Sequence, residues 1–225
     1  MFLTSKNCTP LVFLVRSFGV CILWANPTFT TSLAERIGLM SPYNQGSVAS
    51  RLNAALADVQ LAPYVSGSCE PWSVSTIIGL MFVARPKRVL ELGTFMGLTT
   101  KALAGALTPE QTLTTVEIDA SRFINARRHV GVRDNVKHLH TNALDFLRSC
   151  APGDFDFAFV DDDHTYAHVA AEIVELKRIL PKDSLIVMHD VVGDFGLGDL
   201  VRVHGGVIID LPILHNDGAL GVIRV

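Results

Sequence analysis

Short apolar runs alternate with longer amphipathic segments along most of the chain. The apolar runs have the length of buried strands, and most are followed by a segment whose apolar positions repeat with helical spacing. The expected strands are residues 88–92, 111–117, 136–140, 155–160 and 184–188, and the expected helices are residues 47–59, 72–83, 98–107, 120–130, 146–150 and 165–180. This strand–helix alternation predicts an α/β domain with a mostly parallel, doubly wound sheet.

The turn after the first of these strands is the most informative stretch. Residues 88–92 run directly into Gly93 and Gly97, and an alanine- and leucine-rich helix follows. Gly93 can adopt a backbone conformation closed to other residues, and Gly97 lets helix and strand approach closely. Because the first N–H groups of the helix point into the turn, this pattern favours a nucleotide-like ligand.

The spacing of this turn and the end of the second strand narrow the ligand class. The turn reads E-x-G-x-x-x-G from Glu91, whereas dinucleotide-binding turns read G-x-G-x-x-G. The second strand ends in Glu117. A carboxylate at that position can accept hydrogen bonds from both hydroxyls of a ribose.

Ionisable side chains gather where the fourth and fifth strands end. They are Asp161, Asp162, Asp163 and His164 after the fourth strand, and His189 and Asp190 after the fifth. Like charges this close raise each other's pKa, and such crowding usually has a cation or a reaction to explain it. Since parallel strands end on the same edge of a sheet, we expect both groups to lie beside the glycine turn.

These features resemble the class I S-adenosylmethionine-dependent methyltransferases. The first motif of that family is the acidic glycine turn seen at residues 91–97, and its second strand ends in the acid seen at Glu117. The sequences V-D-D-D-H-T-Y (160–166) and M-H-D-V (188–191) resemble, more narrowly, the small-molecule O-methyltransferases. The relatives implied are the catechol methyltransferases and the sugar- and antibiotic-modifying branch.

The resemblance covers residues 45–225, which we expect to form the methyltransferase domain. Residues 206–211 and 218–225 look like the last two strands of the family. The implied fold is a Rossmann-like, doubly wound sheet of seven strands, mostly parallel, with a C-terminal antiparallel hairpin. The implied activity is transfer of a methyl group from S-adenosylmethionine to a small molecule, with oxygen favoured and nitrogen or carbon left open.

The resemblance also assigns roles to individual residues. The cofactor site implied in this way consists of Glu91, Gly93, Thr94, Phe95, Gly97, Thr99, Glu117, Ile118, Ala143, Leu144 and Asp161. Residues of the glycine turn would surround the methionine part, Glu117 would hold the ribose, and Ala143 and Leu144 would lie beside the adenine. Ser68 and Glu70 either touch the cofactor or cap the helix that follows them.

Many of the relatives hold one magnesium ion between an acid at the end of strand four and two polar residues at the end of strand five. By position, these ligands would be Asp161, His189 and Asp190. Magnesium prefers oxygen ligands, so a histidine in this set favours a softer divalent cation or no metal at all.

In the same layout, a general base follows about three residues after the first metal ligand. His164 occupies that position, with Asp163 as its rival. The ordinary pKa of histidine suits proton transfer near neutrality, whereas Asp163 would need burial or a neighbouring anion to raise its pKa. The alternative is that Asp162 and Asp163 cap the next helix and that His164 only bonds to the backbone.

Composition limits the partners. The 225 residues have a formal net charge of −3 and a pI near 6.2, and lysines and arginines are scattered. The sequence contains no stripe of basic and aromatic residues, so we expect a small substrate and no nucleic acid. The four cysteines form no C-x-x-C pair, which favours reduced thiols and a cytoplasmic location.

Residues 1–44 form an N-terminal extension of open role. Within it, residues 10–24 are strongly apolar but include Arg16, and such a segment is too short and too charged for stable membrane insertion. Three explanations compete: a helix that packs on the domain or on a second subunit, a true start near Met40, and a targeting signal. A homo-oligomer is therefore one option.

Two other functions compete with methyl transfer. An NAD(P)-dependent oxidoreductase can share this architecture, but the spacing after Glu91 argues against it. A cofactor-binding subunit without turnover would use the same pocket, and Asp161 and His164 would then be dispensable. Titrations with NADH and with S-adenosylmethionine distinguish the oxidoreductase from the methyltransferase. Substitution of Asp161 and His164 distinguishes the non-catalytic subunit from the enzyme.

Overall fold

The described residues of the computed structural model are 10–15, 19–24, 66–193, 195–210 and 219–225. The helix expected at residues 47–59 and the alternative start near Met40 lie outside this part of the chain.

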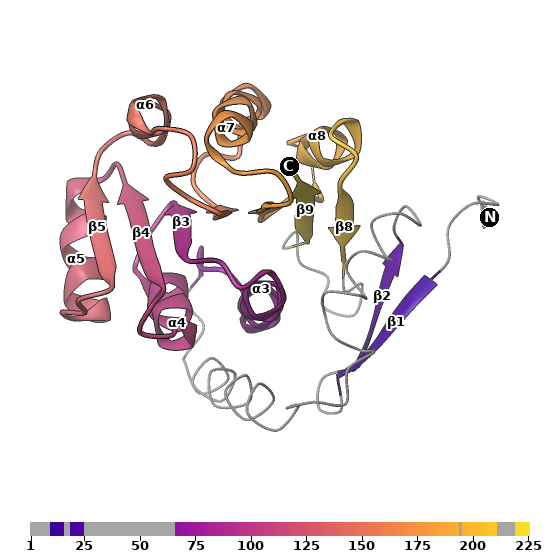
Figure 1. Cartoon of the computed structure of the whole chain (residues 1–225), viewed down its shortest axis with the longest axis horizontal. Coiled ribbons are helices and arrows are strands. Elements are labelled where there is room, and N and C mark those ends of the chain that lie inside the picture. The colour runs from indigo at the N-terminus through magenta and orange to yellow at the C-terminus, as the bar shows by residue number, and fades with distance from the viewer. Residues whose placement is uncertain (1–9, 16–18, 25–65, 194, 211–218) are drawn as a thin grey trace.

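A seven-stranded sheet forms the centre of the molecule (Figure 1). Its strands are β3 (Arg88–Leu92), β4 (Thr112–Glu117), β5 (Val136–His140), β6 (Phe157–Val160), β7 (Leu185–Met188), β8 (Val207–Ile209) and β9 (Leu220–Arg224). The order is β5-β4-β3-β6-β7-β9-β8, in which β9 runs antiparallel to β7 and β8 and the other pairs are parallel. The predicted fold class is confirmed, including the antiparallel C-terminal pair.

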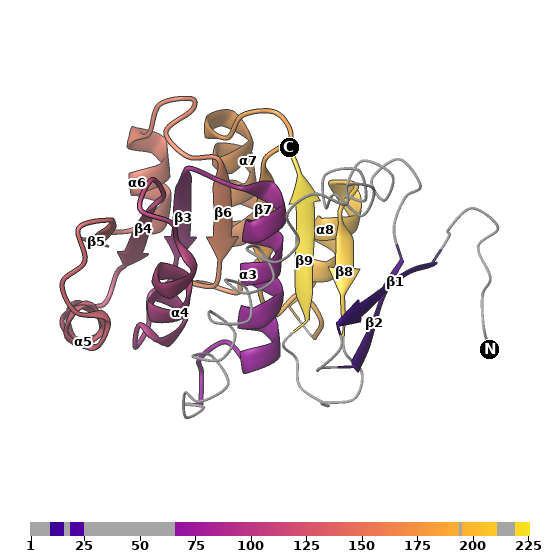
Figure 2. The ribbon, with the colours of Figure 1, turned by 60° about the horizontal axis from the view of Figure 1, so that its bottom comes forward.

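Helices cover both faces of this sheet. The described helices are α3 (Pro71–Ala84), α4 (Leu98–Ala106), α5 (Ala120–Val130), α6 (Ala143–Ser149), α7 (Tyr166–Ile179) and α8 (Leu197–Val203). Figure 2 shows α3, α4 and α5 on one face, with α6, α7 and α8 behind the other. None of these helices combines the length and the apolar character needed to cross a bilayer.

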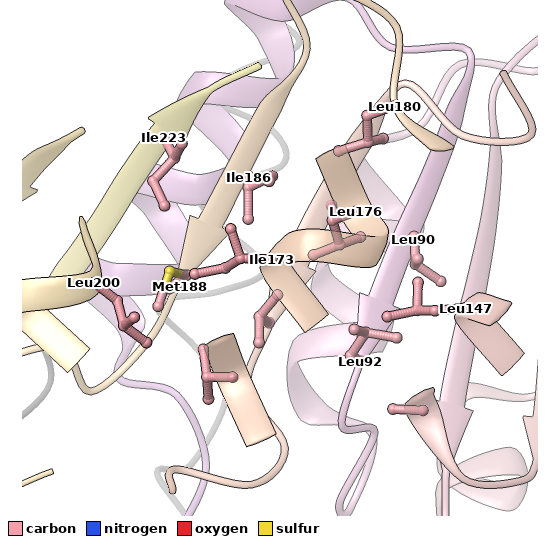
Figure 3. Close-up of a cluster of buried hydrophobic side chains, with 14 of the residues drawn as sticks. Leu90, Leu92, Leu147, Ile173, Leu176, Leu180, Ile186, Met188, Leu200 and Ile223 are labelled. Atoms are coloured by element: carbon pink, nitrogen blue, oxygen red, sulfur yellow. The ribbon is translucent and has the colours of Figure 1, made fainter. Parts of the chain in front are cut away.

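The sheet has an apolar core on each side because successive side chains of a strand point to opposite faces. Leu90 and Leu92 enter the core beneath α6 and α7 (Figure 3), whereas Val89 enters the core beneath α3 and α4. The buried face of α7 consists of Val169, Glu172, Ile173, Leu176 and Ile179. The charged residue in that set, Glu172, has no exposed surface.

The N-terminal apolar segment differs from its leading expectation. Residues Pro10–Val15 (β1) and Gly19–Trp24 (β2) pair as an antiparallel hairpin, so the expectation of a helix here is wrong. Both segments are rich in valine and other residues with high β propensity, which favours strands over a helix. β2 lies beside β8, at the edge of the main sheet (Figure 1).

Two further elements differ from expectation for local reasons. Helix α6 begins at Ala143 instead of Phe146, because the side chain of Asn142 caps it by accepting a hydrogen bond from the Asp145 N–H. No helix was expected after β7, yet α8 forms there behind Gly196, which has a left-handed φ of 73°.

Candidate active site

The turn between β3 and α4 lies at the sheet edge where the parallel strands end. Gly93 and Gly97 have left-handed φ angles of 90° and 79°. A Cβ atom at Gly93 would lie 2.2 Å from the backbone oxygen of Asp161, so only glycine lets β3 and β6 end this close together. Phe95 is also left-handed, with φ of 49°. That conformation is costly for a residue other than glycine and occurs preferentially at functional sites.

A pocket of about 670 Å³ opens above this turn. Its lining includes the predicted cofactor residues Gly93, Phe95, Glu117, Ile118 and Ala143, and also the predicted catalytic and metal-ligand residues Asp161, Asp163, His164, His189 and Asp190. The parallel sheet therefore brings both predicted groups to one cavity.

Five other predicted cofactor residues do not line this pocket: Glu91, Thr94, Gly97, Thr99 and Leu144. Glu91 is fully buried, accepts a hydrogen bond from the Thr100 hydroxyl at 2.6 Å, and has its pKa raised to about 8 by burial. Thr94 is buried against the hydroxyl of Thr115. These two residues support the turn from beneath, and direct contact of the five with a cofactor stays a prediction.

Glu117 is oriented by the backbone around it. Its Oε2 accepts the Phe95 N–H at 2.8 Å, and its Oε1 accepts the Asp119 N–H at 2.9 Å. Each oxygen of an ionised carboxylate has two lone pairs, so both can still accept a hydrogen bond from a ligand hydroxyl. The neighbouring Ile118 is 65% exposed and presents an apolar surface to the pocket.

His189 lies among the carboxyl groups of Asp161, Glu70 and Asp190. Its Nδ1 is 3.1 Å from Asp161 Oδ1, and its Nε2 is 2.9 Å from Glu70 Oε2. Burial opposes a charge on His189, but hydrogen bonds to Asp161, Asp190 and Glu70 outweigh burial and raise its pKa well above the ordinary value. These carboxylates therefore favour the protonated, positively charged form of His189.

His164 faces the same carboxylates from the pocket side. Its Nε2 lies 3.2 Å from Asp190 Oδ2 and 3.6 Å from Asp161 Oδ1. These two contacts raise the pKa of His164 to about 9, although partial burial opposes the charge. The argument from the ordinary pKa of histidine needs correction here, because this environment keeps His164 mostly protonated at neutral pH.

Asp163 has a different environment. Its Oδ1 accepts the Thr165 N–H at 2.8 Å, just before α7 begins, and this hydrogen bond lowers its pKa. The side chain is 49% exposed. A carboxylate with a lowered pKa is a weak base near neutrality, so the geometry favours the helix-entry role considered for Asp163.

Comparison with known proteins agrees with this site. The Methyltransferase domain family matches residues 90–191. A catechol O-methyltransferase of Mycobacterium tuberculosis is 31% identical over 153 residues, which are 65% of this chain and 67% of that protein. The chain belongs to the class I S-adenosylmethionine-dependent O-methyltransferases.

Other relatives match this methyltransferase less extensively. A caffeoyl-CoA O-methyltransferase of Stellaria longipes is 26% identical over 109 residues, and the chain spans 45% of that protein. The fold matches the O-methyltransferase of Bacillus cereus, solved with S-adenosylhomocysteine, with a TM-score of 0.60 and 18% identity over 88% of this chain and 97% of that chain. TomG of Streptomyces achromogenes, solved with S-adenosylmethionine, has a TM-score of 0.57, 20% identity and coverage of 88% and 96%. These structures establish the shared fold.

Asp161, His189 and Asp190 lie together with His164, but a histidine among these ligands fits magnesium poorly. Both ring nitrogens of His189 face carboxylates, and a protonated imidazole has no lone pair for a metal. The positive charge of His189 already balances the neighbouring carboxylates. The divalent cation expected at these residues is therefore not supported.

Sequence reasoning missed several residues of the pocket. Arg122 lines the pocket from α5, and its guanidinium lies 5.0 Å from the centre of the Phe95 ring. Asn142 lines it as the cap of α6. His168 lines it from α7. The available signal for His168 was its position four residues before Glu172, which puts the two side chains on one face of a helix.

Proposed function

We propose that this methyltransferase transfers the methyl group of S-adenosylmethionine to a phenolic hydroxyl of a small molecule, with His164 as the general base. The observation that supports this proposal best is a single pocket lined by two unlike groups of residues. One group offers the acceptors and the apolar surface that a nucleoside needs, and the other contains a histidine beside two carboxylates.

The wall around Glu117 fits the nucleoside of the cofactor. Glu117 has free lone pairs for both ribose hydroxyls, and the exposed side chain of Ile118 and the nearby Ala143 offer apolar contact to the adenine. S-adenosylmethionine, when bound there, supplies a methyl group activated by its sulfonium charge. The protein must then align the acceptor and remove its proton.

His164 is placed for the proton transfer. Its Nε2 faces Asp190 and Asp161, so the neutral ring keeps its proton on Nε2 and has its lone pair on Nδ1. Nδ1 takes the hydroxyl proton as the acceptor oxygen bonds to the methyl carbon, and the sulfur leaves with the electron pair of the S–CH3 bond. Asp190 is the positioning residue that fixes this tautomer.

The pKa of His164 favours a phenol over an aliphatic alcohol. Proton transfer from an acid to a base is less uphill when their two pKa values are close. The pKa of His164 is about 9, and that of a phenol such as the tyrosine side chain is about 10. An aliphatic hydroxyl is a far weaker acid. The relative from M. tuberculosis is named for catechol, which is a phenol.

The charge of His189 takes the place of a metal at the ends of β6 and β7. Asp161 and Asp190 are held by an imidazolium ion, so the proposed proton transfer needs no cation between them. Added magnesium is therefore expected to leave the rate unchanged.

The test is transfer of an isotope-labelled methyl group from S-adenosylmethionine to catechol, compared with cyclohexanol as an aliphatic alcohol. His164→Gln should lower kcat by roughly 10²–10⁴-fold, as expected for loss of a general base, and leave the affinity for S-adenosylhomocysteine unchanged. His129→Gln, at an exposed position on α5, is the matched control and should retain full activity. Full activity in His164→Gln would show that another group removes the proton.

A further inference from the structure

A second group of ionisable side chains lies beside the same pocket. Asp162 follows β6, and His168 and Glu172 lie one turn apart on α7. These three residues are called the His168 cluster below. His168 Nε2 is 3.4 Å from Asp162 Oδ2 and 3.3 Å from Glu172 Oε1, and one donor atom from each residue lies within 4.8 Å of the others.

The buried polar atoms of the His168 cluster lack hydrogen bonds. Glu172 has no exposed surface, and among the described residues neither of its carboxylate oxygens has a hydrogen-bond partner. The same holds for Nε2 of His168 and Oδ1 of Asp162. Buried polar side-chain atoms are normally bonded, so four unbonded atoms within one buried cluster call for a missing partner.

Charge adds to this argument. Burial, followed by the nearby Asp162 carboxylate, raises the pKa of Glu172 to about 10. Without a cation Glu172 is therefore protonated at neutral pH, because its carboxyl group and that of Asp162 have only His168 between them. A cation at this point would bond to both carboxylates and remove their repulsion.

The spacing of the donor atoms matches ligands around one ion. A tetrahedral zinc ion with bonds of about 2.0–2.1 Å holds its ligand atoms about 3.3–3.4 Å apart, which is the edge of the tetrahedron. Direct N–H···O hydrogen bonds are shorter, about 2.7–3.2 Å. His168 Nε2 lies close to the tetrahedral spacing from both carboxyl groups, at 3.4 Å from Asp162 and 3.3 Å from Glu172.

We propose that Asp162, His168 and Glu172 bind one divalent transition-metal ion, with a further coordination position open toward the pocket. One imidazole and two carboxylates suit zinc and its neighbours in the first transition row better than magnesium. Asp162 and His168 line the pocket, so the ion lies in its wall and ties residues 161–164 to α7. This site does not depend on the proposed phenol chemistry.

The test is a titration of the metal-free, full-length chain with Co²⁺, followed by visible absorption. Four-coordinate Co²⁺ absorbs visible light much more strongly than six-coordinate Co²⁺, so the spectrum reports the geometry. The wild-type chain is expected to bind one Co²⁺ with a four-coordinate spectrum that added Zn²⁺ abolishes. Glu172→Gln and His168→Gln should each weaken binding at least about tenfold, because loss of a ligand should cost no less than loss of an outer-shell partner.

Two control variants locate the ion. His129→Gln removes an exposed histidine of α5 and should bind Co²⁺ as the wild type does. Asp190→Asn alters the corner around His189 and should also keep the affinity. Equal binding by wild type and Glu172→Gln would overturn the proposal, and so would loss of binding in Asp190→Asn with retention in Glu172→Gln. Binding of S-adenosylhomocysteine verifies the fold of each variant, and His168→Gln serves if Glu172→Gln does not fold.

Discussion

The acid–base behaviour of His164 is set by its neighbours. Because His164 must be neutral to accept a proton and its pKa is raised to about 9, kcat should increase with pH up to about 9. Asp190→Asn removes one of the two carboxylates that favour the charged ring, so it should move this increase to lower pH. The measurement is kcat with catechol as a function of pH.

The matched control for this pH profile is Asp145→Asn, which alters an exposed carboxylate on α6 and should leave the profile unchanged. A different pH profile would assign the proton transfer to another residue. If kcat is already constant above about pH 5, a carboxylate such as Asp163 removes the proton instead of His164.

Glu172 should destabilise the metal-free protein. Its carboxylate is fully buried without a hydrogen-bond partner among the described residues, and such a group costs about 1–3 kcal/mol. Because burial raises the pKa of Glu172 to about 10, folding at neutral pH forces this side chain to be protonated. Glu172→Gln cannot ionise and avoids that cost, so it should raise the free energy of unfolding in urea by about 1–3 kcal/mol with EDTA present. Glu175→Gln, which removes an ion pair with Arg178 on the same helix, should have an effect below about 1 kcal/mol. A loss of stability in Glu172→Gln would contradict this account.

Among the structural elements, the close ends of β3 and β6 depend on one glycine. Gly93 and Gly153 have nearly equal φ angles, 90° and 87°, but an added Cβ would meet the Asp161 backbone at 2.2 Å in the first and nothing within 4 Å in the second. Gly153→Ala should therefore lower the free energy of unfolding by roughly 1–2 kcal/mol, which is the cost of holding alanine in the left-handed conformation. Gly93→Ala should cost clearly more in urea unfolding, and equal costs would show that the strand ends can separate without penalty.

The elements with long periodic patterns could be predicted from the sequence. The spacing of apolar residues on α7 and the short apolar run of β3 depend on burial against the sheet, which leaves a clear pattern. Elements fixed by one local interaction could not be predicted in the same way. The start of α6 depends on whether Asn142 or Asp145 caps it, and α8 depends on the conformation of Gly196.

At the scale of the whole molecule, the sheet order brings distant residues to one pocket. From the sequence, a parallel sheet was expected to bring Glu117, Asp161 and His189 to one edge. The structure shows the parallel pairs that do so: β3 with β4, β3 with β6, and β6 with β7. The sequence could not show which side chains pair there. The contact of His189 with Glu70 joins residues 119 positions apart, and it adds to the contacts with Asp161 and Asp190 that raise the pKa of His189.

The most direct test of the central claim is calorimetric titration of the purified chain with S-adenosylhomocysteine, with NADH as the comparison. The account predicts saturable binding of one S-adenosylhomocysteine per chain, unaffected by added magnesium, and no binding of NADH. Binding of NADH alone, or no binding of S-adenosylhomocysteine with or without divalent cations, would contradict it.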